Sequence, residues 1–327
     1  MKLPEKERGA ALLSILLLVA VLAVIAATTL DRVALSTKLA GNGAVLAQAR
    51  AYSYAAESIA TARLEDLLSR DAAQTTLAGG WMGQPQQLPI PVGSATATVR
   101  DAGNCFNLNS LVTDINGVMA ASSVGQEQFV VLMTTLGIAE NQARPVAAAS
   151  ADWADADMLA LPAGAEDESY RVTKTPYLAA NQLFAHPSEL RAVKGVTPDI
   201  YARLRGWICA LPIAELSPLN VNTLLPEQAP LLVMLFPLGK YSPQAARTYL
   251  AKRPASGYGS LIRFWGAPEL AALQPSAMVQ GQVKLTSKWF MLETTVTAGE
   301  LALQGEALIV GDPAPARVLW RSWGEAG

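Results

Sequence analysis

The residues best suited to chemistry in this sequence are acidic and lie near its middle. Six acids fall within 17 residues: Asp152, Asp155, Asp157, Glu166, Asp167 and Glu168. No Lys or Arg lies between Arg144 and Arg171 to neutralise them. Carboxylates at spacings of two and three residues suit Ca²⁺, which takes about 6–8 oxygen ligands, although the offsets are not those of an EF-hand loop. By composition alone, a solvated acidic loop and a metal site explain this segment equally well.

Paired carboxylates also serve as the acid and base of glycoside hydrolases. The aromatic residues that could form a sugar platform near this cluster are few: Trp153, Tyr170 and Tyr177. A hydrolase is therefore poorly supported, and we expect a protein that is not an enzyme.

Histidine and cysteine are scarce. There is one histidine, His186, and there are two cysteines, Cys105 and Cys209. This argues against His-based zinc sites, four-cysteine sites and iron–sulfur clusters. The segment around His186 predicts a loop entering a helix, with a surface histidine. The cysteines are either two buried thiols or, in an exported protein, one disulfide. That bond would close a loop of about a hundred residues, worth up to ~4–5 kcal/mol in the chain-entropy treatment.

The overall composition is that of a folded protein with little net charge. The chain has 327 residues, which as a prior suggests roughly two domains. It carries 25 Lys and Arg against 27 Asp and Glu, a net charge of −2, so no global field attracts nucleic acid. Hydrophobic residues make up 51% of the chain and charged residues 16%, which excludes a disordered polyelectrolyte.

The elements that position these residues begin with a long N-terminal helix. Residues 10–30 form a run of 21 residues without a charge, and about 20 apolar residues span a bilayer. A cleaved secretory signal would need a shorter apolar run. Apolar residues and alanines continue at helical spacing, which predicts one helix from Ala10 to Arg70. Gly41 and Gly43 predict a bend or local unwinding within it.

Strands are predicted at both ends of the remaining chain. Residues 77–93 are rich in glycine and proline, which predicts a loop that could include a short edge strand. Ser94–Arg100 alternates small and β-branched residues, which indicates a strand. Three more strands are predicted at the C-terminus: Trp289–Ala298, Glu300–Val310 and Arg317–Trp323. We expect these four strands to form one antiparallel sheet that packs on the N-terminal helix, an α+β fold.

A six-residue motif occurs twice between these strands. Residues 106–111 (FNLNSL) and 219–224 (LNVNTL) share the order hydrophobic–Asn–hydrophobic–Asn–Ser/Thr–Leu. In each copy the hydroxyl residue or the preceding Asn suits an N-cap. The stretches predicted to be helical after them are Gln126–Leu136, Gln142–Trp153, Pro187–Val193, Pro198–Leu211, Pro226–Phe236 and Pro243–Arg253. We infer two related helical modules inserted between the strands.

The second module is similar to a helix-hairpin-helix unit. Its hairpin, residues 238–241 (LGKY), keeps one glycine where DNA-binding versions have two, and the basic residues around it are few: Lys240, Arg247, Lys252, Arg253 and Arg263. Phosphate binding requires denser positive charge than this. A packing module without affinity for DNA is therefore favoured, and a membrane-anchored DNA receptor is the alternative.

The N-terminus resembles a type IV prepilin signal. A short basic leader ends in Gly9 and is followed by Ala10 and the apolar helix. The resemblance implies that a prepilin peptidase cuts between Gly9 and Ala10 and that the new N-terminus is methylated. Most such proteins have Glu at the fifth mature position, where this sequence has Ser14. Its absence is a trait of the K-type minor pseudopilins of type II secretion systems, and a subunit at the filament tip has no neighbour above it to pair with such an acid.

The resemblance to K-type pseudopilins extends over nearly the whole chain. It implies a pilin-like body that carries a large insert of two modules similar to SAM or helix-hairpin-helix domains. The expected division of the chain is a leader at 1–9, a transmembrane helix at 10–30, its periplasmic continuation at 31–75, first strands at 76–105, a first module at 106–218, a second at 219–275 and C-terminal strands at 276–327.

The same resemblance implies a function and a set of ligands. The acidic motif matches the family pattern at residues 152–157 and 164–170, which implies a structural calcium ion held by Asp155, Asp157, Glu166 and Asp167, with Asp152 as a further ligand. The implied function is capping the pseudopilus tip and initiating its assembly. The implied partners are the I- and J-type minor pseudopilins, the major pseudopilin filament and prepilin peptidase, with no nucleic acid. The implied location is the inner membrane, crossed once, with the globular domain in the periplasm.

Overall fold

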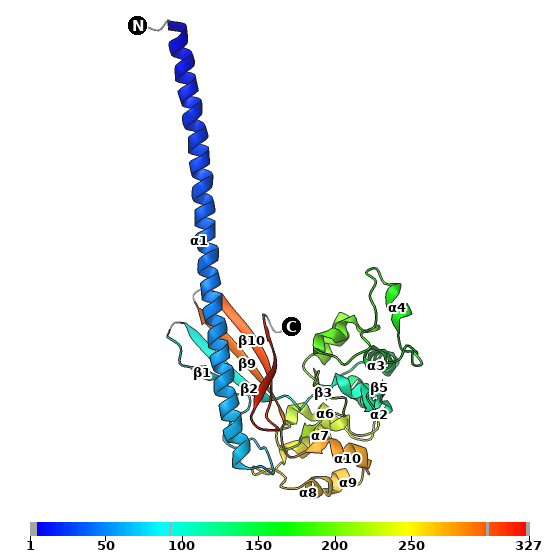
Figure 1. Ribbon diagram of the computed structural model, residues 1–327. Helices are drawn as coiled ribbons and strands as arrows, with labels where there is room; N and C mark the ends of the chain where they lie inside the picture. Colours follow the sequence, from blue (N-terminus) through cyan, green and yellow to red (C-terminus); the bar gives the residue numbers. More distant parts are fainter. Residues whose placement is uncertain (1–4, 92, 299–300, 325–327) are drawn as a thin grey trace.

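The computed structural model describes residues 5–91, 93–298 and 301–324, with side chains from Leu12 onward. A single long helix, a five-stranded antiparallel sheet and a helical region make up the molecule (Figure 1). This arrangement confirms the predicted α+β fold.

Helix α1 (Glu5–Arg70) is continuous. Its N-terminal half extends away from the rest of the molecule (Figure 1), and its large apolar side chains there are exposed, from 49% at Val21 to 70% at Leu13. Gly41 and Gly43 lie in this helix with nothing within 4 Å of an added Cβ atom. The predicted local unwinding at these glycines is wrong, because neighbouring good helix formers carry the backbone hydrogen bonds through them.

The C-terminal half of α1 packs on one face of the sheet. The strand order is β1 (Gln86–Leu88), β2 (Ser94–Asp101), β9 (Trp289–Ala298), β10 (Leu301–Val310) and β11 (Arg317–Trp323). Ala60 and Leu64 of α1 contact Phe290, Leu292 and Ile309 of the sheet. Small residues on the helix let it lie close to the strands, so the apolar face of the sheet is covered along its length.

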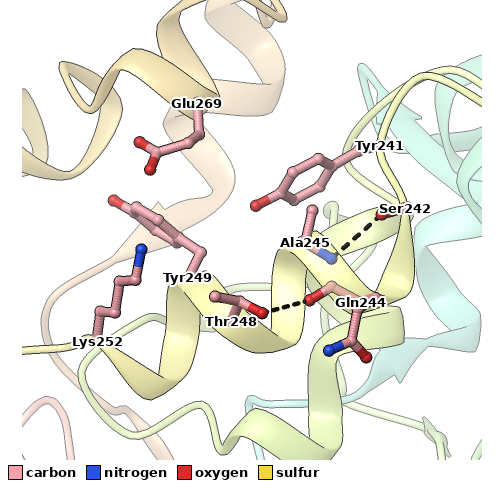
Figure 2. Close-up of a pocket in the computed structure, with 8 residues that line it drawn as sticks. All are labelled: Tyr241, Ser242, Gln244, Ala245, Thr248, Tyr249, Lys252 and Glu269. Carbon is pink, nitrogen blue, oxygen red and sulfur yellow. Dashed lines mark hydrogen bonds between the residues drawn. The ribbon is translucent and has the colours of Figure 1, made fainter.

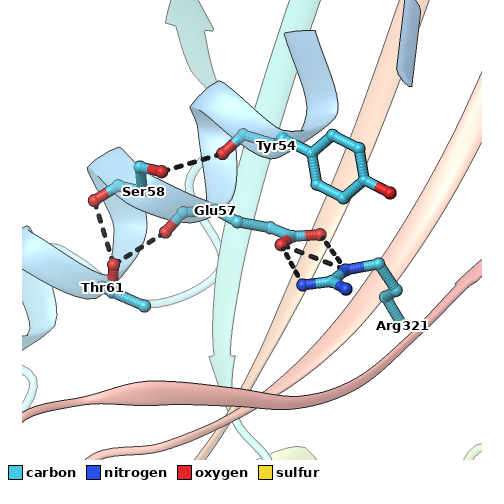
Figure 3. A network of polar contacts seen from close by, with 5 residues as sticks. All are labelled: Tyr54, Glu57, Ser58, Thr61 and Arg321. Atoms are coloured by element: carbon cyan, nitrogen blue, oxygen red, sulfur yellow. Dashed lines mark hydrogen bonds and ion pairs between the residues drawn. The ribbon is translucent and has the colours of Figure 1, made fainter. Parts of the chain in front are cut away.

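An ion pair between an exposed arginine and a buried glutamate joins the last strand to the helix. Arg321 of β11 reaches Glu57 of α1, next to Tyr54 (Figure 3). Because β11 is an edge strand with β10 as its only sheet neighbour among the described strands, this contact fixes its outer side to the helix.

The helical region is an insertion between two neighbouring strands. β2 and β9 are paired antiparallel, with Asp101 opposite Phe290, and just beyond this pair the amide of Ala102 donates to the carbonyl of Trp289 at 2.9 Å. The chain therefore leaves the sheet and returns to it at one point. Leu211 of the insert packs with Trp289, Leu308 and Val310 on the sheet face opposite α1.

The insert contains mostly short helices around one large core. Its α-helices are α2 (Ser123–Thr135), α3 (Glu140–Ala154), α4 (Asp167–Arg171), α5 (Pro198–Leu204), α6 (Ala229–Val233), α7 (Pro243–Ala251), α8 (Leu261–Trp265), α9 (Pro268–Ala271) and α10 (Ala277–Gln282). Its 3₁₀ helices are η1 (Leu108–Leu111), η2 (Pro187–Ala192) and η3 (Pro226–Gln228). Three two-stranded ladders complete it: β3 (Phe106–Asn107) with β6 (Ile208–Cys209), β4 (Val112–Ile115) with β5 (Val118–Ala121), and β7 (Leu219–Asn220) with β8 (Val283–Lys284).

Two details of this region differ from the predictions. The helix predicted over Pro198–Leu211 ends at Leu204, because the chain then forms β6 beside β3. The β4–β5 hairpin was missed although its signal is in the sequence: Asn116 and Gly117 have φ angles of 56° and 87°, and Asn-Gly is the preferred pair for such two-residue turns.

Candidate functional site

The acidic loop is folded by its most buried carboxylate. Asp152 lies near the end of α3, is 0% exposed, and accepts hydrogen bonds from the amides of Leu161 at 3.2 Å and Ala165 at 2.6 Å. A Cβ atom on Gly164 would lie 1.9 Å from Asp152 Oδ2, so glycine is required for this close approach. Asp152 thereby brings the segment before α4 back to the end of α3.

Three carboxylates meet where this loop closes. One oxygen each from Asp155, Asp157 and Glu166 lie within 4.8 Å of one another. Asp155 is 2% exposed and Glu166 is 7% exposed, while Asp157 is exposed. Asp155 Oδ1 and both oxygens of Glu166 are buried and meet no hydrogen-bond donor in the described part of the chain. Buried polar oxygens without partners are costly, and a bound cation or bound protons would offset that cost here.

Burial and the crowding of carboxylates also raise the pKa values in this cluster. Burial, followed by the charges of Asp157 and Asp152, raises the pKa of Asp155 to about 7. Burial and the neighbouring acids, Asp152 foremost, also raise the pKa of Glu166 to about 7. Hard oxygen donors of this kind suit Ca²⁺. Asp155, Asp157 and Glu166 are the residues that would hold it, and the ion would neutralise their mutual repulsion.

The other two predicted ligands lie outside this group of three. Asp152 is engaged with the backbone amides described above. Asp167, the first residue of α4, pairs with Arg171 at 2.9 Å and accepts a hydrogen bond from the amide of Ala179 at 3.1 Å. Both residues therefore shape the loop and are not aimed at the point where the three carboxylates meet.

The aromatic residues beside the loop pack on one another. Trp153 lies edge-on to Tyr170 with ring centroids 5.4 Å apart, and Tyr177 is 5.2 Å from Tyr170. Trp153 is at the end of α3 and Tyr170 is in α4, so these rings hold together the two ends of the loop. They do not form an open sugar platform.

The repeated motif has equivalent hydrogen bonds in both modules. Asn107 and Asn220 each accept a hydrogen bond from the amide two residues on, at 3.2 and 2.9 Å. Asn109 accepts from the amide of Phe184 and Asn222 from that of Tyr258. Each motif also begins with a two-residue strand in a parallel pair. The asparagines are thus structural anchors: Asn107 caps η1, and both pairs tie distant loops to the start of a module.

Residues after the predicted boundary at residue 275 also contact the second module. β7, which contains Leu219 and Asn220, pairs with β8 at Val283 and Lys284. The buried Asp101 at the end of β2 contacts the hydroxyls of Thr223, at 2.5 Å, and Ser287. This polar cluster joins the second module to the sheet.

The remaining predicted site residues are placed as follows. Cys105 and Cys209 are joined by a disulfide with Cα atoms 5.9 Å apart, beside the β3–β6 pair. Gly9 and Ala10 belong to helix α1, which is described here by its backbone alone, and residues 1–4 lie outside the described part of the chain. His186 caps η2, with Nδ1 2.7 Å from the Ser188 hydroxyl, as expected for a loop that enters a helix.

One of the basic residues around the hairpin of the second module, Arg253, has a structural role. Arg253 is directed inward and donates to the carbonyls of Val221, at 3.2 Å, and Leu224. Its burial lowers the pKa of its guanidinium. One of the five basic residues around the hairpin therefore holds the module together, as a packing module requires.

Membrane insertion is the other property that the structure bears on. By length and composition, α1 could cross a membrane once, and its most apolar segment is bare of protein contacts. An apolar helix that emerges from a folded domain in this way is typical of a single-pass anchor.

The chain is similar to known proteins over nearly its whole length. Two family models, both described as type II secretion system protein K, match residues 104–213 and 219–286. The type II secretion system protein K of Pectobacterium carotovorum subsp. carotovorum is 31% identical, over 98% of this chain and 97% of the relative. That of Klebsiella pneumoniae is 34% identical over 93% of each chain. A chain in the crystal structure of the GspK-GspI-GspJ complex from the enterotoxigenic Escherichia coli type 2 secretion system matches with a TM-score of 0.74 and 31% identity, over 85% of this chain and 96% of that one. The chain belongs to the type II secretion system protein K family.

Proposed function

We propose that this protein is the minor pseudopilin that caps the tip of the pseudopilus and helps to initiate its assembly, for export of folded proteins across the outer membrane. The observation that carries the proposal is the position of the helical insert. It lies beside and beyond the C-terminal end of α1, at the end of the molecule opposite the exposed apolar segment (Figure 1).

This position favours a terminal subunit. Subunits of a helical filament pack through their N-terminal helices, and each leaves room for the next one above it. An insert at the distal end occupies that room. Ser14 adds a second argument, because a hydroxyl supplies no negative charge to pair with the N-terminal ammonium of a neighbouring subunit.

The proposed partners follow from the relative of known structure. That relative lies in a complex of K-, I- and J-type subunits, so we expect the I- and J-type minor pseudopilins to bind this chain. The partly exposed Tyr54 and Ile59 on α1 offer apolar area for such contacts. The major pseudopilin filament and the prepilin peptidase complete the set of expected partners. Before assembly, α1 crosses the inner membrane and the sheet and insert lie in the periplasm.

We also propose a calcium ion at Asp155, Asp157 and Glu166. The three oxygens within 4.8 Å of one another and the buried oxygens that have no donor among the described residues support it. The ion would be structural, because it would close the loop between α3 and α4. We propose no hydrolase activity for these carboxylates.

The capping role can be tested in cells that lack their own protein K. The full-length chain would be compared with a variant in which two glycines replace residues 103–288. Ala102 and Trp289 are hydrogen-bonded neighbours, so the short link can close the sheet without the insert. Immunogold labelling of pseudopili should place the full chain at one filament end and the shortened chain along the shaft. Label of the full chain along the shaft would contradict capping.

A further inference from the structure

A surface hollow of about 350 Å³ lies in the second module, between α7 and α9. Tyr241 and Tyr249 form part of its walls, with Lys252 just after the end of α7 and Glu269 on α9 (Figure 2). From the sequence, a packing role is favoured for this module, with DNA binding as the alternative. The hollow is separate from the acidic loop and plays no part in the proposed capping.

The tyrosine walls are held rigidly from behind. Tyr241 lies edge-on to Phe236 with centroids 5.2 Å apart, and Tyr249 lies edge-on to Phe264 at 5.7 Å. The Tyr249 hydroxyl also donates to the carbonyl of Phe264 at 3.0 Å. Because the rings are already fixed, a ligand would not have to order them on binding, which favours affinity.

Polar groups at the hollow are left without partners. The Tyr241 hydroxyl is buried and meets no hydrogen-bond partner within the described residues. Glu269 forms no ion pair with any side chain that the structure describes. Its carboxylate is directed over the hollow from α9 (Figure 2). Burial, and then the charge of Glu269, raises the pKa of Tyr241 to about 12; the field of the carboxylate therefore reaches the tyrosine.

These features select a cation with a flat face. A carboxylate and electron-rich rings both attract positive charge, and an unpaired hydroxyl oxygen can accept a hydrogen bond from it. Guanidinium stacks on aromatic rings and donates in a planar fork to carboxylates, whereas ammonium is a compact, strongly hydrated charge. Lys252 lies on the Tyr249 side of the hollow (Figure 2). Its ammonium could form an ion pair with a carboxylate of the same partner.

We propose that this hollow is a docking site for an arginine side chain of a partner protein, whose guanidinium binds Glu269 and the Tyr241 hydroxyl. The rim carries exposed residues, among them Gln244 and Thr248. Such a rim suits a side chain that projects from a protein surface better than an enclosed small molecule, which pockets bury almost completely.

The chemistry of the site can be tested with the full-length protein in detergent, labelled with 3-fluorotyrosine. The chain has eight tyrosines, so Tyr241→Phe and Tyr249→Phe assign the two signals. N-acetyl-arginine amide should shift both signals saturably, and the citrulline analogue, which has the same shape without charge, at least fivefold less. Glu269→Gln should weaken the affinity for the arginine probe at least fivefold, whereas Glu227→Gln, an exposed glutamate of the same module, should not change it. Equal responses to both probes, no response, or indifference to Glu269→Gln would overturn the proposal.

The nature of the partner can be tested in secreting cells. A photo-crosslinking amino acid would replace Thr248 at the rim, and in a control Gln280, which is exposed on α10 outside the hollow. We expect a protein adduct from position 248 whose cross-linked peptide contains an arginine, and at least a fivefold loss of this adduct with Glu269→Arg. An adduct that survives Glu269→Arg, an attached peptide without arginine, or no protein adduct at position 248 would show that the hollow does not dock an arginine side chain.

Discussion

Arg321 on the last strand forms an ion pair with the buried carboxylate of Glu57 on α1, 264 positions earlier in the chain. Its Nε donates to both carboxylate oxygens at 3.0 and 3.2 Å, and its Nη2 donates to one of them at 2.9 Å. The guanidinium also lies 5.1 Å from the ring of Tyr54. Glu57 is 7% exposed, and among the described residues Arg321 is the one cation that forms an ion pair with it. The C-terminal edge of the sheet is therefore fixed to α1, the helix that could cross a membrane by its length and composition.

Removing Arg321 should lower the free energy of unfolding more than removing an ordinary surface charge does. Arg321→Ala leaves the Glu57 carboxylate buried without its partner, and we expect a loss of roughly 1–3 kcal/mol in the free energy of unfolding. Urea unfolding of the protein lacking residues 1–30 measures it. Arg317→Ala, an exposed arginine on the same strand, is the matched control. Equal losses for the two variants would mean that the ion pair does not stabilise the fold.

The two asparagine anchors should act on different modules. Asn107→Ala removes the bonds to the carbonyl of Ile213 and the amide of Leu211, at 3.0 Å each. Asn220→Ala removes those to Thr75 and Ser287, at 3.0 and 2.8 Å. Each buried bond contributes about 1 kcal/mol, so each variant should lose roughly 2–4 kcal/mol. Hydrogen exchange should increase first around residues 108–213 in Asn107→Ala and around residues 221–284 in Asn220→Ala. The same exchange pattern in both would refute separate anchoring.

Elements that follow from local pattern could be predicted from the sequence. The strands at Ser94 and after Trp289 were located within one residue at most ends, because alternation and flanking glycines are local signals. The helix predicted to continue to Leu211 failed for the opposite reason. Residues 205–211 have no strong pattern, and a parallel partner about a hundred residues away decides their conformation.

For the acidic site too, the sequence predicts what is local, and contacts between distant residues could not be predicted. The sequence identified the cluster, and the structure brings Asp155, Asp157 and Glu166 together. It could not reveal that Asp152 binds backbone amides across the loop or that Asp167 faces Arg171, since both depend on how the loop folds. The hollow at Tyr241 was missed because its walls come from α7 and α9, and no spacing in the sequence relates Tyr241 to Glu269.

Processing of the leader should depend on Gly9. In membranes of a strain with a prepilin peptidase, the mature protein should begin at Ala10 and carry one N-terminal methyl group. Gly9→Leu should leave a full-length precursor and abolish secretion, because the bulky side chain blocks the peptidase. Mass spectrometry of the intact protein distinguishes the two forms, and a mature mass in Gly9→Leu would contradict the prediction.

The disulfide should be present in protein prepared from the periplasmic side. Alkylation without reduction should label neither Cys105 nor Cys209, and reduction should expose both. Loss of the bond in a Cys105→Ser, Cys209→Ser variant should lower the free energy of unfolding by up to ~4–5 kcal/mol, since it spans 104 residues. Two labelled thiols in unreduced protein would show that the bond does not form in the cell.

Calcium should stabilise the protein through the three clustered carboxylates. A ligand that binds only the folded state adds RT ln(1 + [L]/Kd), about 2.7 kcal/mol at a hundred times Kd. The melting temperature of the protein lacking residues 1–30 should therefore be higher in calcium than in chelator, and Mg²⁺ should substitute poorly because it requires a tighter octahedron. Asp155→Ala and Glu166→Ala should each remove most of this shift. Glu168→Ala is the control, as this neighbouring acid lies outside the group of three.

The calcium effect should also grow with pH. Without metal, the pKa values of Asp155 and Glu166 are raised to about 7, above the values near 4 of an unfolded chain. Between these pH values the folded state therefore keeps protons that the unfolded state releases. The stabilisation from these protons is fully present below about pH 4 and is lost as the pH rises through 7. Calcium competes with those protons and replaces their neutralising effect. The difference in melting temperature between calcium and chelator should thus be small at pH 5 and largest near pH 8. A difference that is the same at both pH values would place the ion elsewhere, and a protein indifferent to calcium at pH 8 would leave the cluster a solvated acidic loop.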